Sequence, residues 1–218
     1  MNGRRAVAPL ALIAAAALGQ AAPATAAPLK VVRASADATV RADHPRATDG
    51  RSELLRVAAH PATRTYLRFP LTGLEGRLVQ RATLWVRVDA AHPWRGLAAA
   101  ATDGRAWSER RLTWRSRPAA RPPVGTATRA PGAWRAIDVT SLVRANGRLD
   151  LVLTATRGTG AVLASREAGR ADAPRLRLRT VRDVQPAFPV RTALYDTQRP
   201  AGRYHPSRGR YDGDNALV

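Results

Sequence analysis

The sequence has no cysteine, so disulfide bonds cannot stabilise the fold. Lysine is almost absent as well, because Lys30 is the sole lysine and the other basic residues are all arginine. Aromatic residues account for only 5% of the chain, although the total hydrophobic content is 45%. A folded domain must therefore take its stability from a core built largely of aliphatic side chains, or from a bound ion.

Negative charge is also scarce. The chain has 16 acidic residues against 36 basic ones, and its formal net charge is +20. A nucleic-acid-binding protein would be expected to gather its basic residues into a stripe or a run. The arginines are instead spread almost evenly along the chain. We therefore predict no nucleic-acid partner, and the charge favours polyanions without identifying one.

Long apolar runs are missing except at the N-terminus. Arg4 and Arg5 precede an apolar run at residues 6–18, which is too short to span a bilayer. The sequence Ala-Thr-Ala follows at residues 24–26 and is typical of a signal-peptide cleavage site. We predict that residues 1–26 are a cleaved signal peptide and that the protein is secreted into the extracellular space. We also predict no membrane span and a monomer.

Residues 30–180 read as short strands separated by glycine, proline and aspartate. Alternating apolar residues at 84–88 predict a half-buried strand, and residues 148–154 and 175–179 repeat the pattern. In the last of these segments three arginines share the solvent face. Regularly spaced short strands, with no helical periodicity after the signal peptide, predict an all-β fold: a jelly-roll β-sandwich.

Residues 106–118 contain two of the five tryptophans and end at a proline. We interpret this segment as a loop that enters a short strand, with both rings in the core, because buried tryptophan supplies large apolar area to a small β domain. The predicted core residues are Leu67, Phe69, Leu84, Val86, Val88, Trp107, Trp114, Ile137, Val139, Leu151 and Leu153.

Seven segments occur in an order that resembles a known family. They are residues 36–40, 52–57, 65–69, 82–88, 107–114, 137–140 and 164–168. Together they resemble a DNRLRE-type domain, similar to carbohydrate-binding module family 96, over nearly all of residues 31–180. The resemblance implies a secreted jelly-roll sandwich that binds polysaccharide and can carry calcium. The family often has Asn-Tyr-Gly where this chain has Thr48-Asp49-Gly50.

A second resemblance begins at Phe188. Residues 188–195, 204–207 and 209–212 are similar to the opening strand and loop of a glycoside hydrolase domain of family 99 or 71. The chain stops at Val218, whereas such a barrel needs roughly 250 residues. No catalytic carboxylate pair can be assigned, so we predict a non-catalytic chain derived from a truncated modular enzyme. Residues 181–218 are then a linker and a poorly ordered tail.

The favoured function is a polysaccharide-binding module, and acidic polysaccharides are included among its ligands. Trp94 lies outside the strand-like segments and can stack on a sugar ring, although it can equally fold back over the edge of the sandwich. Arg95 can donate paired hydrogen bonds to hydroxyls or a uronate. Tyr66 is a weaker third candidate, because its strand position is more often a core position. The alternative is an adhesive or structural cell-surface domain whose arginine-rich face binds anionic wall polymers.

A structural calcium ion is the one cofactor the sequence suggests. Ca²⁺ takes six to eight oxygen ligands, largely carboxylates and carbonyls. Asp37 opens the first strand and Glu167 precedes the last, and the terminal strands of a sandwich can lie side by side. Asp43 and Asp49 follow the first strand and are the next candidate ligands. The alternative for Glu167 is an ion pair with an arginine.

Other chemistries find little support. The four histidines are not placed at the spacing of metal ligands, so zinc is not predicted. No serine lies in a Gly-x-Ser-x-Gly motif, and no glycine-rich phosphate loop is present. Asp103 and Glu109 could flank a glycosidic bond, but a structural role is favoured for both.

Overall fold

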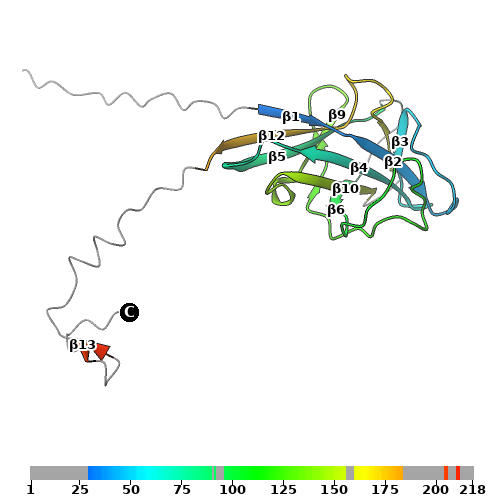
Figure 1. Cartoon of the computed structure of the whole chain (residues 1–218). Coiled ribbons are helices and arrows are strands. Elements are labelled where there is room, and N and C mark those ends of the chain that lie inside the picture. The colour runs from blue at the N-terminus through cyan, green and yellow to red at the C-terminus, as the bar shows by residue number, and fades with distance from the viewer. Residues whose placement is uncertain are drawn as a thin grey trace, which may run out of the picture.

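The computed structural model describes residues 29–89, 91, 96–155 and 160–183, together with two short strands at 204–205 and 210–211. Figure 1 shows the arrangement of its strands. The predicted signal peptide at 1–26 lies outside the described residues, as does most of the predicted tail. Within the described part, no helix has the length and hydropathy needed to cross a membrane.

Two five-stranded sheets, both antiparallel, make up the fold. The first sheet has the order β1 (Leu29–Arg33), β12 (Arg175–Arg182), β5 (Arg77–Arg87), β9 (Trp134–Asp138) and β8 (Thr128–Arg129). The second has the order β2 (Ala36–Arg41), β4 (Thr63–Leu71), β10 (Gly147–Ala155), β6 (Leu97–Ala101) and β7 (Gly125–Thr126). The prediction of an all-β fold is confirmed.

The remaining elements are short. Strand β3 (Leu54–Val57) pairs with β11 (Ala161–Ala164), and β13 (Tyr204–His205) pairs with β14 (Arg210–Tyr211). A 3-10 turn, η1 (Thr140–Leu142), links β9 to β10.

The main core lies between the inner faces of the two sheets. Leu67 and Phe69 of β4 and Leu151 and Leu153 of β10 meet Leu84 and other inward residues of the first sheet there. The predicted core residues are all buried except Trp114, which is only partly buried. Each fully buried large aliphatic side chain contributes on the order of 1.5–3 kcal/mol through removal of apolar area from water.

A smaller core lies on the outer face of the second sheet. The long loop between β6 and β7 crosses this face and buries Trp107 and Leu112 against Tyr66 and Val152. The Tyr66 hydroxyl donates a 2.8 Å hydrogen bond to the carbonyl of Pro118 in the same loop. Tyr66 is therefore fully buried and offers no ring face to a sugar, which corrects its place among the predicted binding residues.

The two ends of the folded region lie side by side, but the strand that Asp37 opens is not the one involved, because it is β2 and pairs with β4 in the other sheet. Strand β1 pairs with β12 so that Leu29 is opposite Arg179 and Arg33 is opposite Arg175. Beyond this ladder the Ala34 amide donates a 3.0 Å hydrogen bond to the Pro174 carbonyl. The segment that leads into β2 is thereby held beside the segment that leads into β12.

Candidate functional site

Three carboxylates from distant parts of the sequence meet near the start of β2. They belong to Asp37, Glu109 and Glu167, and one oxygen of each lies within 4.8 Å of the others. We call this group the acid cluster. The Asp37 amide donates a 2.9 Å hydrogen bond to Oε1 of Glu109, and the Arg166 amide donates a 2.8 Å bond to Oδ2 of Asp37. Backbone contacts therefore fix the relative positions of β2, the β6–β7 loop and the segment after β11.

Among the described residues, the guanidinium of Arg166 accompanies these three acids. Arg166 donates from Nε to Oε1 of Glu109 at 2.8 Å and from Nη2 to Oε2 at 3.0 Å. Its Nε also lies 3.0 Å from Oε1 of Glu167. Glu167 thus has the arginine partner that was the alternative to a metal role, and it lies in the acid cluster as well. One arginine leaves the charge of three ionised carboxylates incompletely balanced.

The pKa of Asp37 is strongly affected by this arrangement. Burial raises the pKa of Asp37 to about 7, the Arg166 amide opposes the shift, and the nearby charges of Glu167 and Glu109 add to it. Near neutral pH this carboxyl therefore either holds a proton or needs a cation beside it. The cluster offers the hard oxygen donors that Ca²⁺ prefers, so its residues fit such an ion.

The structure places the other two predicted calcium ligands outside the acid cluster. Asp43 forms an ion pair with Arg41, at 2.8 Å between Nη2 and Oδ2, and its Oδ1 lies 3.2 Å from Nδ1 of His44. The hydrogen bond from Arg41 lowers the pKa of Asp43 to about 2. The backbone carbonyl of Asp49 accepts a 3.2 Å bond from the Thr39 amide, and its side chain borders a separate cavity.

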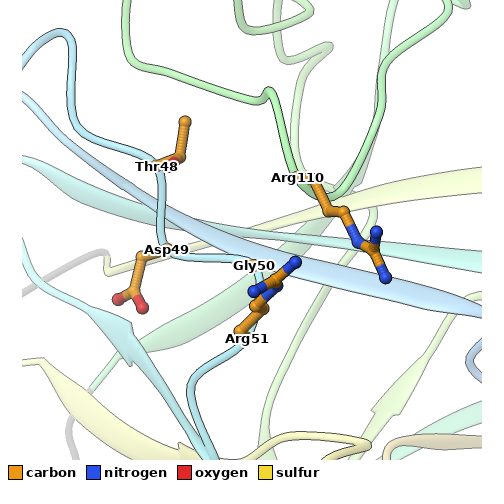
Figure 2. Close-up of a pocket in the computed structure, with 5 residues that line it drawn as sticks. All are labelled: Thr48, Asp49, Gly50, Arg51 and Arg110. Carbon is orange, nitrogen blue, oxygen red and sulfur yellow. The ribbon is translucent and has the colours of Figure 1, made fainter.

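That cavity is lined by Thr48, Asp49, Gly50, Arg51 and Arg110 and has a volume of about 270 Å³. We call it the arginine pocket. Figure 2 shows Arg51 and Arg110 extending from two different loops, with the Asp49 carboxylate pointing away from both guanidinium groups. The pocket therefore presents two cationic hydrogen-bond donors to solvent.

Gly50 joins the arginine pocket to the acid cluster. A Cβ atom at this position would lie 2.1 Å from the backbone oxygen of Glu109 and 2.9 Å from its Cγ. Only glycine allows the loop at 48–51 to approach the β6–β7 loop this closely. The two sites share this wall, so their geometries depend on each other.

The remaining predicted residues have different outcomes. Trp94 and Arg95 lie outside the described residues, and their role stays a prediction. Asp103 accepts hydrogen bonds from the amides of Arg105 at 3.1 Å and Ala119 at 3.2 Å, so it holds the β6–β7 loop together as its structural interpretation requires. Glu109 was missed as a partner of Asp37, although it is the sole acid among the arginines of its segment. Nothing in the sequence distinguishes Arg51 and Arg110 from the other arginines.

Comparison with known proteins gives one family. The model of carbohydrate-binding module family 96 matches residues 28–180, a range that runs from β1 into β12 and includes both sheets and both sites. No curated protein matches the chain. The matched family is a binding module and not a catalytic domain. The chain belongs to carbohydrate-binding module family 96.

Proposed function

We propose that this protein is a secreted, non-catalytic module that binds polysaccharide as the accessory part of a modular glycoside hydrolase. The observation that carries the proposal is the family match over the whole sandwich. The hydrolase-like sequence after Phe188 supports the accessory role, and the N-terminal pattern supports secretion. A jelly-roll topology is part of the proposal, and it is supported by a chain that crosses repeatedly between the sheets.

The arginine pocket is the proposed sugar site within the described residues. Guanidinium groups form paired, charge-assisted hydrogen bonds with carboxylates. At about 270 Å³ the pocket is at the small end of ligand sites, and this suits one sugar unit rather than a long stretch of chain. We therefore propose an acidic sugar unit as its occupant. Trp94 and Arg95 lie outside the described residues and stay separate candidates for sugar contact on the strength of their residue types.

A glycan titration over a salt series tests this function. The double variant Arg51→Gln/Arg110→Gln should lose roughly tenfold or more in affinity for an oligouronate, as expected for the loss of two charge-assisted contacts. The matched control Arg105→Gln/Arg121→Gln removes the same charge from the β6–β7 loop and should bind like the parent.

The outcomes separate the proposal from its alternative. A built sugar site keeps much of its affinity at high salt, whereas adhesion through charge alone loses most of it. Equal binding by the pocket variant and its control would move the site elsewhere, and Trp94→Ala would then be the next variant to measure. If the parent binds no neutral or acidic glycan, polysaccharide binding is rejected.

We also propose that the acid cluster holds a structural calcium ion. Asp37, Glu109 and Glu167 would supply carboxylate oxygens, and the ion would balance the charge that Arg166 leaves uncompensated. Calcium should raise the melting temperature and EDTA should lower it, because a ligand that binds only the folded state stabilises that state. Asp37→Asn should abolish the response, whereas Asp43→Asn, outside the cluster, should keep it. A parent whose melting temperature ignores both reagents has no such ion.

A further inference from the structure

The outer face of the first sheet carries arginine and tryptophan side chains that have no role in the proposed function. Arg175, Arg177 and Arg179 of β12 alternate with the buried Leu176 and Leu178, so the three arginines all lie on the solvent side. Strand β12 lies between β1 and β5, and Figure 1 shows these strands side by side. On the same face, Trp85 of β5 is directly opposite Arg175.

The arginines and tryptophans of this face form a connected set of stacked contacts. The guanidinium of Arg177 lies 3.7 Å from the ring centroid of Trp85, and that of Arg175 lies 4.0 Å from the centroid of Trp134 on β9. The two rings are 6.2 Å apart and tilted by 52°. We call Trp85, Trp134, Arg175, Arg177 and Arg179 the Arg/Trp face. Cation–π contact holds these guanidinium groups close to the sheet and restricts their motion.

The two stacked guanidinium groups lack polar partners. Within the described residues, neither Arg175 nor Arg177 donates a side-chain hydrogen bond, and the Nε atom of each is buried without an acceptor. Burial lowers the pKa of Arg175, the neighbouring charges of Arg177 and Arg33 act in the same direction, and the charge of Asp172 opposes them. An anion at the exposed edge of either guanidinium would relieve the repulsion between these neighbouring positive charges.

The spacing of charge across this face fits an extended anion. Alternate residues of a strand are about 6.6 Å apart and neighbouring strands about 4.8 Å apart. Arg33 and Arg81 extend the positive array, since Arg33 is opposite Arg175 and Arg81 is opposite Arg179. Two acids border this array. Asp172 pairs with Arg87 and also acts on the charge of Arg175, while Asp138 accepts two hydrogen bonds from Thr140 and also interacts with the charge of Arg81. The arginines of the array outnumber these two acids, so the face stays positive.

The stacking of arginine on the Trp85 and Trp134 rings affects which class of ligand this face can bind. Neutral sugars and single-stranded nucleic acids are commonly held by stacking on open aromatic faces. Here each ring already has a guanidinium over it, so the groups offered to a ligand are the N–H edges of the arginines. Those edges suit carboxylates, which accept two parallel hydrogen bonds from one guanidinium.

We propose that the Arg/Trp face is a second binding surface of the module, taken by a polysaccharide chain that carries carboxylate groups. This inference rests on the proposed polysaccharide-binding function and adds a site distinct from the arginine pocket. The face belongs to the sheet of β12, β5 and β9, whereas the pocket is built by the loops at 48–51 and 106–112. A module with two such surfaces holds two chains at once and gains avidity on a dense polyuronate.

The test uses the folded module with polygalacturonate, its oligomers, and a carboxyl-reduced form of the same polymer as the neutral probe. Arg175→Gln/Arg177→Gln should weaken binding of the oligouronate about tenfold and leave binding of the reduced polymer unchanged. Arg105→Gln/Arg121→Gln is the control of equal charge. Arg179→Gln, at an exposed position, leaves both stacked pairs in place and should weaken binding about threefold without a change in melting temperature.

Combination with Arg51→Gln/Arg110→Gln separates this inference from the proposed function. If the two surfaces are independent, each double variant should keep part of the binding and the quadruple variant should lose it. The parent should also cross-link long polygalacturonate, as light scattering measures, whereas neither double variant should.

If the face variants bind like their control while the pocket variant loses binding, this inference is overturned and the proposed function stands. Binding of duplex DNA as tight as that of polygalacturonate, lost in the same face variants, would also overturn it in favour of a general polyanion surface. A parent that binds no polysaccharide at all overturns both.

Discussion

At the scale of single residues, arginine guanidinium groups stack on the tryptophan rings of the described structure. Arg117 lies 3.7 Å from the centroid of Trp114, Arg68 lies 4.3 Å from that of Trp107, and the Arg/Trp face adds two more pairs. A planar guanidinium stacks on an indole ring more effectively than the compact ammonium of lysine. Some of the excess arginine therefore has a structural use that composition alone does not reveal.

The two tryptophans of the β6–β7 loop should differ in their contribution to stability. Trp107 is 8% exposed and packs edge-on against Tyr66, whereas Trp114 is only partly buried and lies between Arg64 and Arg117. Trp107→Ala should cost roughly 3–5 kcal/mol, as expected for a buried aromatic, and Trp114→Ala roughly half as much or less. Urea unfolding of both variants measures the difference. Equal losses would contradict the exposure of Trp114.

Asp37 should make stability depend on pH near neutrality. Its pKa is about 7 in the fold and 3.8 in the unfolded chain, so the folded protein holds a proton that the unfolded chain releases. This contribution is fully present below the unfolded pKa and is lost as pH rises through about 7, so the free energy of unfolding should increase as pH falls from about 8 to about 5. At about 1.4 kcal/mol for each pH unit below the folded pKa, the gain down to pH 5 is at most about 3 kcal/mol.

Two variants check this prediction in urea titrations with EDTA present. Asp37→Asn should flatten the profile between about pH 5 and 8, because the titrating group is gone. Asp43→Asn should leave that range unchanged, since the pKa of Asp43 is lowered to about 2 and its effect appears only in acid. A parent that is less stable at pH 5 than at pH 8 would show that the Asp37 carboxyl is not shifted upward.

At the scale of elements, the β6–β7 loop is the segment that the sequence described least well. A short strand was predicted within residues 106–118, but that segment contains only turns and irregular backbone. The polar groups of this segment form local hydrogen bonds instead. The hydroxyls of Thr113 and Ser116 lie 2.9 Å apart, and each hydroxyl accepts a hydrogen bond from the backbone amide of the other residue. Such side-chain bonds offer the backbone an alternative to a ladder with another strand.

The contact between the loop at 48–51 and the β6–β7 loop gives a prediction at this scale. Gly50→Ala would place a methyl group 2.1 Å from the Glu109 carbonyl oxygen, and the two loops would have to separate. We expect a loss of about 1–3 kcal/mol, as for overpacking, together with weaker oligouronate binding in the arginine pocket. Thermal unfolding and a glycan titration measure the two effects.

A second glycine provides the control. Gly76 has a positive φ of 58° and nothing within 4 Å of an added Cβ, so Gly76→Ala tests backbone strain without a clash. It should cost about 1 kcal/mol and leave glycan binding unchanged. If Gly50→Ala and Gly76→Ala behave alike in both measurements, close packing of the two loops is not what holds the pocket.

At the scale of the whole molecule, the pairing of β1 with β12 joins the ends of the folded region. Every strand of both five-stranded sheets lies within residues 29–182. A chain of residues 28–183 should therefore unfold in one cooperative transition, with a melting temperature within a few degrees of that of the chain 27–218. Differential scanning calorimetry makes the comparison. A large loss of stability on shortening would show that residues beyond 183 contribute to the core.

The sequence by itself determined the strands and most of the core, because the period-2 alternation of apolar residues is a local property that each strand carries along its own length. It also suggested Asp37 and Glu167 as neighbours, although the strand pairing assumed for them does not occur, because Asp37 lies on β2 and β2 pairs with β4. Only the tertiary structure brought Glu109 to this pair, buried Tyr66 beneath a loop, and selected Arg51, Arg110, Arg175 and Arg177 from many similar arginines. These outcomes depend on which distant segments come into contact. Such contacts follow from the packing of the whole chain, so the local pattern of residues does not predict them.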